Sequence, residues 1–139
     1  ANPDRFNLLV PENFNAKIEN GILKIENENN SISIMISYES LKENLKNEEI
    51  NNIFNDFKTK CGEIYSIVSP LSIENRKEYN DTFANIIFTS KFKNNYTFNA
   101  MAIAIKNKES IILTLSSSVY ISAYLISFAK NIINSLYFK

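Results

Sequence analysis

Three carboxylates lie close enough together in this chain to support acid–base chemistry. Glu74, Glu78 and Asp81 fall within one short segment that also contains Arg76 and Tyr79. A carboxylate pair at such spacing could act as a general acid and a general base. The alternative is a solvated strand edge whose mixed charges discourage aggregation, and the interleaved charges favour this interpretation.

The composition excludes most other catalytic groups. The sequence contains no histidine and a single cysteine, so neither a Ser-His-Asp nor a Cys-His arrangement can be built. One thiol without imidazole leaves only carboxylates to hold zinc, and two glycines cannot form a Gly-rich phosphate-binding loop. Glu26, Glu28 and Asn30 superficially resemble calcium ligands, but the glycine and the terminal glutamate of an EF-hand loop are missing. We therefore predict that the protein is not an enzyme and binds no cofactor or metal ion.

The segment from Pro70 to Asp81 is instead the best candidate for a partner-binding surface. Pro70 prevents a regular ladder hydrogen bond at its position. Arg76 offers a planar fork of donors, Tyr79 an amphipathic ring, and Glu74 an acceptor. Arginine and tyrosine are enriched at binding hot spots. We predict that Glu74, Arg76 and Tyr79 contribute to binding another protein, although an ordinary edge strand would carry similar charges.

The charge balance restricts the class of partner. Lysine and arginine number 15, and aspartate and glutamate also number 15, so the formal net charge is zero. Nucleic-acid binding and polybasic membrane anchoring both depend on clustered positive charge, and the balance argues against both. No apolar stretch reaches the ~18 residues that a transmembrane helix needs. The start, Ala1-Asn2-Pro3, is compatible with a mature chain whose export signal has been removed, and a lipid anchor could then lie outside this chain.

The last third of the chain has the clearest strand pattern. Ala84–Phe92 and Ser110–Ser117 alternate apolar and polar residues, as half-buried strands do. Tyr96–Ile105 between them is apolar on both faces, so we expect an interior strand that is covered on both sides. Asparagine in Lys93–Asn95 and Asn107–Lys108 suits tight turns. An antiparallel meander follows from these turns.

A long amphipathic helix is predicted after these strands. Its apolar stripe comprises Ile121, Leu125, Phe128, Ala129, Ile132 and Leu136. Ser117 or Ser118 could act as the N-cap. Tyr120 and Tyr124 are four residues apart, and packing at the rim of the core is favoured over a ligand-facing aromatic pair.

Short strands and tight turns also dominate the N-terminal part. Phe6–Val10 is a short strand candidate. Asn20-Gly21 is a strong turn signal between Ala16–Glu19 and Ile22–Glu26, and Ser31–Ser37 is the next strand. The connections are too short for crossovers, so these strands must be antiparallel.

A first helix is predicted after this meander. Ser40–Glu43 fits a capping box, and the helix would run toward Lys60, with a break near Asn44–Asn47 left open. Gly62 is placed to follow its last turn. Cys61 falls on the apolar stripe of this helix, so we expect a buried thiol rather than a reactive one.

The middle of the chain returns to strand. Glu63–Ser69 is a strand that Pro70 interrupts, and Leu71–Tyr79 is a further strand or an exposed excursion. A length of 139 residues suits one domain with its own core. The order of strands, helix, strands and helix predicts a single α+β domain, residues 1–139, with a mainly antiparallel sheet.

Three short motifs carry a resemblance to a known superfamily. They are the opening run Phe6–Phe14 with its Val-Pro step, the turn Asn20-Gly21-Ile22, and the ending Phe128–Phe138 with its Ser-Leu-Tyr-Phe run. Together with the order of elements, they resemble the PsbP-like superfamily. This group includes photosystem II extrinsic proteins, a fungal Ran-binding import factor and bacterial DcrB-type lipoproteins. Phe14 stands where tryptophan is common in the family, and the family's glycines in the final meander are absent.

The resemblance implies an α+β fold whose antiparallel sheet carries a helix on each face, and a binding or assembly role. We therefore expect a non-enzymatic domain of a bacterial envelope lipoprotein, located in the envelope or secreted, with another protein as its partner. Two alternatives stay open. One is a cytoplasmic chaperone for secreted effectors, a role that related folds serve. The other is a small enzyme that uses the carboxylates of Glu74, Glu78 or Asp81.

Overall fold

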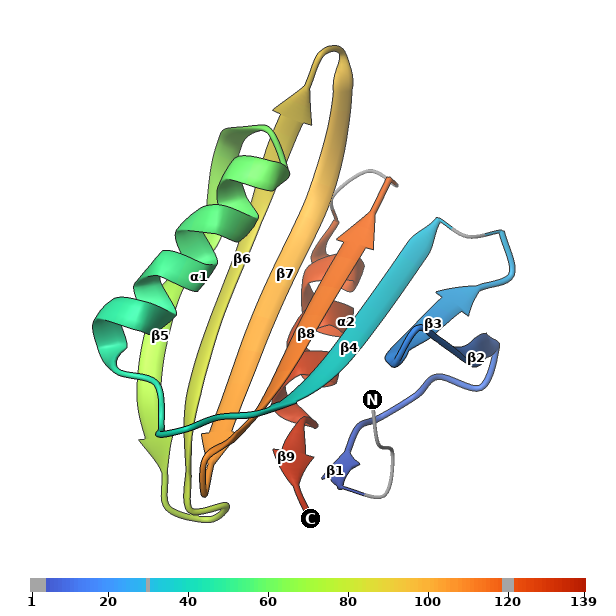
Figure 1. Ribbon diagram of the computed structural model, residues 1–139. Helices are drawn as coiled ribbons and strands as arrows, with labels where there is room; N and C mark the ends of the chain where they lie inside the picture. Colours follow the sequence, from blue (N-terminus) through green and yellow to red (C-terminus); the bar gives the residue numbers. More distant parts are fainter. Residues whose placement is uncertain (1–4, 30, 119–121) are drawn as a thin grey trace.

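An antiparallel sheet and two helices form the computed structural model, which describes residues 5–29, 31–118 and 122–139. The expectation of a removed export signal rested on Ala1-Asn2-Pro3, which lies outside these residues. The elements, in chain order, are β1 (Phe6–Asn7), β2 (Phe14–Glu19), β3 (Ile22–Asn27), β4 (Ile32–Ser40), α1 (Asn47–Lys60), β5 (Glu63–Arg76), β6 (Asp81–Phe92), β7 (Asn95–Lys106), β8 (Glu109–Ser117), α2 (Ala123–Asn134) and β9 (Tyr137–Phe138). Figure 1 shows their arrangement. The predicted α+β class and antiparallel sheet are confirmed.

Two meanders combine into one seven-stranded sheet with the strand order β2-β3-β4-β8-β7-β6-β5. The first contains β2 to β4 and the second β5 to β8, and every neighbouring pair is antiparallel. β4 and β8 join the meanders, with a register from Ile32↔Ser117 to Ser40↔Glu109. β1 and β9 form a separate two-stranded sheet that brings the two ends of the chain together.

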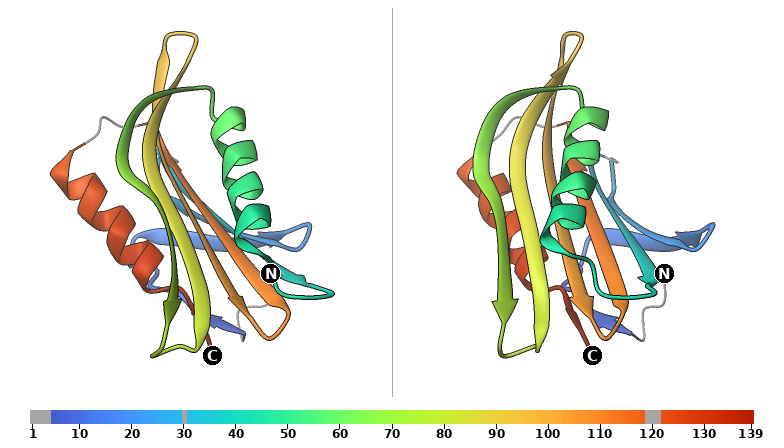
Figure 2. Two further views of the ribbon diagram at one scale, coloured as in Figure 1. Left: turned by 90° about the vertical axis from the view of Figure 1, so that its left-hand side faces the viewer. Right: turned by 60° about the vertical axis from the view of Figure 1, so that its left-hand side comes forward.

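β7 is interior, as predicted, and its side chains from Phe98 to Ile105 are buried on both faces. Ala100, Ala102 and Ala104 lie in one core cluster, which also contains the α2 residues Leu125, Ala129, Ile132 and Ile133. Met101, Ile103 and Ile105 lie in a second cluster with Ile50 and Phe54 of α1. Because successive side chains of a strand point to opposite faces, each face of β7 belongs to a different cluster, and each cluster contains residues of one helix. Figure 2 shows α1 and α2 on opposite sides of the strands. The small alanine side chains leave room for the α2 backbone beside β7.

The first helix begins later than the predicted capping box. Ser40 is the last residue of β4 and pairs with Glu109, so its backbone is committed to the sheet. Lys46 is the N-cap instead, and its backbone N–H donates to Oε1 of Glu49 at 3.0 Å. The helix ends where predicted, because Gly62 adopts a φ of 104°. A Cβ at Gly62 would lie 2.8 Å from the carbonyl oxygen of Lys91, so only glycine fits there.

The C-terminal helix is shorter than predicted, with 12 residues. Ser122, not Ser117 or Ser118, is its N-cap, and its hydroxyl accepts from the Leu125 N–H at 3.1 Å. Ser117 is already part of β8. The helix ends at Asn134 because Tyr137 and Phe138 pair with β1 as a strand. Ile121, predicted on its stripe, lies outside the described residues.

Two strand boundaries also differ from the prediction. Phe6–Val10 contributes only the two residues of β1. β5 continues through Pro70, which has no backbone N–H to donate, and the pairing with β6 is irregular there, between Ser69 and Ser72. β5 is an edge strand, and such strands tolerate proline and bulges.

The predicted turns are confirmed, and the predicted burial of Cys61 is met in part. Asn20 and Gly21 have φ angles of 52° and 78°, and Asn107 and Lys108 have 51° and 62°, as two-residue hairpin turns require. Cys61 is half-buried beside the second cluster. Burial raises the pKa of its thiol, which keeps the unreactive protonated form dominant at neutral pH.

Candidate functional site

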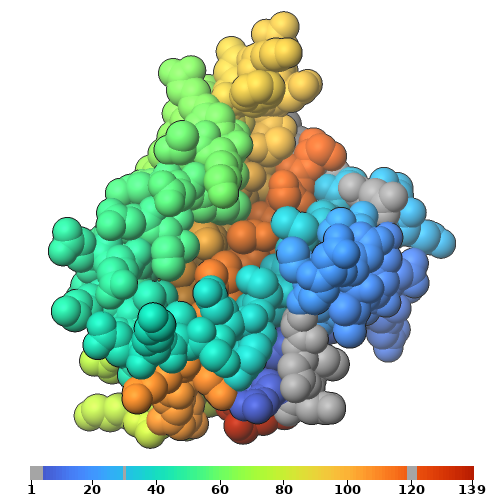
Figure 3. Space-filling view, viewed as in Figure 1, coloured from blue at the N-terminus to red at the C-terminus, as the bar shows by residue number. Residues whose placement is uncertain are grey.

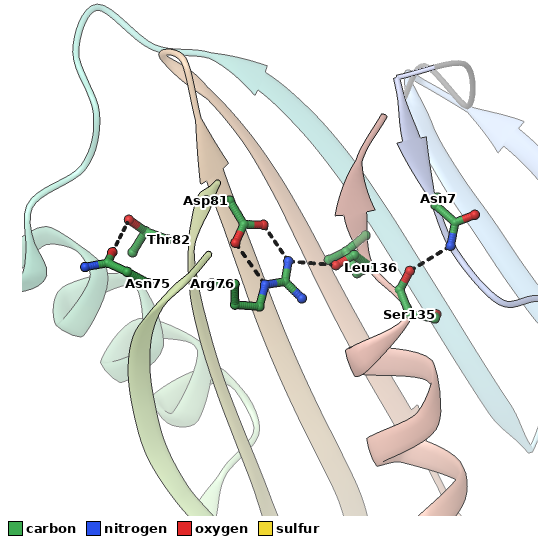
Figure 4. Close-up of polar contacts among 7 residues, drawn as sticks. All are labelled: Asn7, Asn75, Arg76, Asp81, Thr82, Ser135 and Leu136. Atoms are coloured by element: carbon green, nitrogen blue, oxygen red, sulfur yellow. Dashed lines mark hydrogen bonds and ion pairs between the residues drawn. The ribbon is translucent and has the colours of Figure 1, made fainter. Parts of the chain in front are cut away.

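Arg76, predicted to contribute to binding a partner, is buried and ion-paired within the molecule. Its Nε donates to Oδ1 of Asp81 at 2.9 Å and its Nη2 to Oδ2 of the same carboxylate. Nη2 also donates to the Leu136 carbonyl oxygen at 2.9 Å (Figure 4). The side chains of Arg76 and Asp81 are 7% and 0% exposed. The guanidinium therefore ties the β5–β6 turn to the end of the chain after α2.

Aromatic rings enclose the guanidinium. The Cζ atom of Arg76 lies 3.9 Å from the Phe83 ring centroid and 4.6 Å from that of Tyr79. Tyr79 in turn stacks on Tyr137 of β9, with centroids 4.4 Å apart and an interplanar angle of 8°. We call these residues the Arg76 cluster, comprising Arg76, Tyr79, Asp81, Phe83, Leu136 and Tyr137. A buried charge needs a hydrogen-bonded partner, and Asp81 meets that need.

The three predicted binding residues have different environments. Glu74 lies two residues before Arg76 on the edge strand β5 and is exposed. Tyr79 is half-buried, with one face on Tyr137. The structure thus brings Arg76 and Tyr79 into contact and places Glu74 at the surface nearby. Tyr137 and Leu136, which complete the cluster, were not predicted, since no local pattern links them to a turn sixty residues earlier.

The three carboxylates considered for catalysis have different environments. Both oxygens of Asp81 accept from Arg76, whereas Glu74 and Glu78 are exposed. Across residues 5–29, 31–118 and 122–139, no group of three histidine, cysteine or acidic residues could hold a metal ion.

A polar hollow of about 320 Å³ lies beside the Arg76 cluster. Its lining comes from the turns at this end of the sheet and comprises Asn44, Asn75, Arg76, Lys77, Asn80, Asp81, Thr82, Ile105, Lys106 and Asn107. Within it, Oδ1 of Asn75 accepts from Oγ1 of Thr82 at 3.1 Å, and Oδ1 of Asn44 accepts from the Lys108 N–H at 2.8 Å. Amides that donate and accept suit polar, uncharged groups of a ligand. The abundance of asparagine in turns was the only sequence signal for this hollow.

The structure describes only part of two further groups noted in the sequence, the calcium-like residues and the tyrosine pair. Glu26 and Glu28 line a hollow of about 220 Å³, while Asn30 lies outside the described residues. Lys17 lines the same hollow, and its Nζ atom pairs with Oε1 of Glu19 at 3.0 Å. Tyr120 also lies outside the described residues, and Tyr124 is 77% exposed, with its ring 6.4 Å from that of Phe128.

Comparison with known proteins identifies the fold. No protein-family model and no curated protein matches the sequence. The structure is similar to that of cyanobacterial PsbP (CyanoP) from Synechocystis sp. PCC 6803, with a TM-score of 0.75 and 9% sequence identity over 98% of this chain and 88% of that one. The chain has a PsbP-like fold. It is also similar to LpqN of Mycobacterium tuberculosis, a protein involved in cell envelope biogenesis, with a TM-score of 0.65 and 10% identity over 99% of this chain and 86% of that one. The superfamily resemblance seen in the sequence is thereby confirmed for the fold.

The PsbP-like core of this protein contains helices of 14 and 12 residues. Neither helix has the length and apolar character needed to cross a bilayer, within the part of the chain that the structure describes.

Proposed function

We propose that this protein is a non-enzymatic binding or assembly domain of a bacterial envelope protein. The observation that carries the proposal is the likeness to LpqN, a protein of envelope biogenesis, over 99% of this chain. The match extends over nearly the whole domain rather than one supersecondary motif. The engagement of Asp81 by Arg76 supports a binding role, because it removes one of the three carboxylates proposed for acid–base work.

The compartment can be tested directly in the source organism. Cells that express the full-length gene with a C-terminal epitope are separated into cytoplasmic, envelope and secreted fractions, with a known cytoplasmic enzyme as the control. We expect the protein in the envelope or secreted fraction, held by a lipid anchor if one precedes this domain. Recovery with the cytoplasmic enzyme would contradict the proposal and favour the chaperone alternative.

We further propose that a protein partner binds over the exposed side of the Arg76 cluster. Glu74 and the open part of Tyr79 would contact the partner, and Arg76 would act as a positioning residue beneath them. This assignment is supported by the exposure of Glu74 and by the 4.6 Å contact that holds the Tyr79 ring over the guanidinium. The polar hollow adjoins the same surface and would accept polar side chains of the partner.

The test needs a partner captured by cross-linking from the source organism. Glu74→Ala and Tyr79→Ala are then compared with matched exposed controls, Glu28→Ala and Tyr124→Ala. Loss of more than ~2 kcal/mol of binding in the first pair alone, with the fold intact by circular dichroism, would support the surface. Equal affinity in all four variants would remove it from consideration.

A further inference from the structure

The hairpin that joins β6 to β7 extends beyond both neighbouring strands. β5 pairs with β6 only as far as Glu63↔Lys91, and β8 pairs with β7 only as far as Ser117↔Phe98. β6 and β7 continue to pair with each other up to Phe92↔Asn95. We call Lys91–Tyr96 the hairpin tip, and it projects from the body of the molecule in the ribbon and space-filling views (Figures 1 and 3).

Aromatic side chains at and beside the hairpin tip are exposed. Phe92 and Tyr96 are 62% and 49% exposed, and Tyr65 on the adjacent strand is 67% exposed. The Tyr65 and Tyr96 rings meet edge to face with centroids 5.0 Å apart. Large aromatic side chains contribute more than any others to burial at an interface. Tyr96 lies directly opposite Lys91, so Phe92, the next residue along β6, points to the other face, and both faces of the hairpin tip carry an exposed aromatic ring.

Lysines surround these rings. Nζ of Lys91 lies 5.3 Å from the Tyr96 centroid and Nζ of Lys93 lies 5.6 Å from that of Phe92. The last turn of α1 contains Lys58 and Lys60, and Gly62, two residues after Lys60, lies against the Lys91 backbone. The four lysines therefore gather at one end of a protein whose net charge is zero. Glu63 opposite Lys91 is the acidic residue that faces them from β5.

We propose that the hairpin tip docks onto the surface of an anionic phospholipid bilayer. Tyrosine rings settle at the level of the headgroups, and phenylalanine inserts at the boundary between headgroups and acyl chains. Lysines reach anionic phosphates while their aliphatic stems cover apolar surface. A projecting hairpin suits a soft surface that closes around it, whereas an acidic protein would need a matching cleft.

Vesicle flotation of the purified chain tests the proposal independently of the cell-fractionation result. Vesicles of neutral phosphatidylcholine are compared with vesicles that also contain phosphatidylglycerol. We expect binding to the anionic vesicles, and we expect it to weaken as salt screens the charges. Lys91→Gln/Lys93→Gln should lower the partition coefficient about 25-fold, since each lysine near an anionic surface contributes about fivefold. The matched control, Lys42→Gln/Lys130→Gln, removes the same charge from exposed positions elsewhere and should bind like the unmodified chain.

A fluorescence measurement locates the contact, because the chain contains no tryptophan. In Phe92→Trp the single indole should shift its emission to shorter wavelength on anionic vesicles and be quenched by brominated lipids. In Ile18→Trp, at a 56% exposed position on the β2–β3 hairpin, the emission should not change. These outcomes would place the hairpin tip in the interface.

Four results would overturn the proposal. The first is equal flotation with neutral and anionic vesicles, or none with either. The second is an equal loss of binding in both lysine pairs, and the third is an emission shift in Ile18→Trp but not in Phe92→Trp. Tight binding to soluble polyglutamate without binding to vesicles would also overturn it and indicate an acidic protein as the partner of the tip.

Discussion

The Arg76 cluster and the hairpin tip lie at opposite ends of β6 and contain the same kinds of residue. Each places cations against aromatic rings: Arg76 on Phe83 and Tyr79 at one end, and Lys91 on Tyr96 at the other. At the first end the cation is 8% exposed and ion-paired with Asp81. At the second the aromatic rings remain largely in solvent.

The two ends differ in exposure because different elements cover them. The segment after α2 returns to the Arg76 cluster and supplies the Leu136 carbonyl and the Tyr137 ring. β6 and β7 instead overrun their neighbours at the hairpin tip. A cation next to an aromatic ring thus stabilises the fold where other elements cover it, and it stays available for binding where they do not.

The largest loss of stability should come from a substitution in the buried core between the two ends. Ala102 is fully buried in the cluster that includes α2, and Ala102→Asp would bury a carboxylate there. The cost of several kcal/mol is comparable to the ~5–15 kcal/mol stability of a domain, so we expect the whole domain to unfold. Circular dichroism and thermal melting check this. Ala123→Asp, at an exposed position in the first turn of α2, should melt like the unmodified protein because aspartate is favoured there.

Breaking the buried ion pair should destabilise one end strongly. Arg76→Ala leaves the Asp81 carboxylate buried without its partner, and we expect a loss of about 3–5 kcal/mol in the free energy of unfolding. The double variant Arg76→Met/Asp81→Leu removes both charges and should recover most of that loss. Urea denaturation measures both values. A double variant no more stable than Arg76→Ala would show that the charge left behind is not the cause.

Removing one aromatic ring should lower the stability more at the Arg76 cluster than at the hairpin tip, and both losses should be smaller than that of Arg76→Ala. Tyr79→Ala loses the stack on Tyr137 and the contact with Arg76, and we expect a loss of about 1–2 kcal/mol. Tyr96→Ala at the hairpin tip should cost only about 0.5 kcal/mol, as substitutions at exposed positions do. Tyr79→Phe, which keeps the ring, is the control. Equal melting temperatures for the two alanine variants would contradict the contrast between the ends.

An exposed ion pair away from both ends should have the smallest effect. A hydrogen bond from Lys17 lowers the pKa of Glu19 below its ordinary value of 4.5. A lowered carboxyl pKa contributes stability above that ordinary value and loses it as the pH falls through the lowered pKa. Glu19→Gln should therefore melt only slightly below the unmodified protein at neutral pH, and the difference should vanish in acid. A gap that widens as the pH falls would contradict the assigned sign.

Local patterns were enough to predict much of the sheet. The apolar run of β7, the alternation in β6 and β8, and the Asn20-Gly21 turn all depend on residues close in sequence, and each is confirmed. Prediction failed where a distant strand competed for the same residues. Ser40 begins a good capping sequence, but it pairs with Glu109 of β8 and is therefore the last residue of strand β4. Leu136 is the last residue of the predicted helical stripe, but α2 ends at Asn134 because Tyr137 and Phe138 pair with β1.

The sequence by itself determined the α+β class, the antiparallel connections and the absence of histidine chemistry, because composition and short-range periodicity carry that information. Only the tertiary structure decided the roles of the charged and aromatic residues. Arginine is a residue type common at binding sites, yet the Arg76 guanidinium is bound by Asp81, five residues later, and by the Leu136 carbonyl, sixty residues later. Phe92 looks like an ordinary strand residue, yet β5 pairs with β6 only as far as Lys91 and β8 pairs with β7 only as far as Phe98, which leaves Phe92 projecting. Burial depends on which distant elements arrive at a position, and a linear pattern does not contain that information.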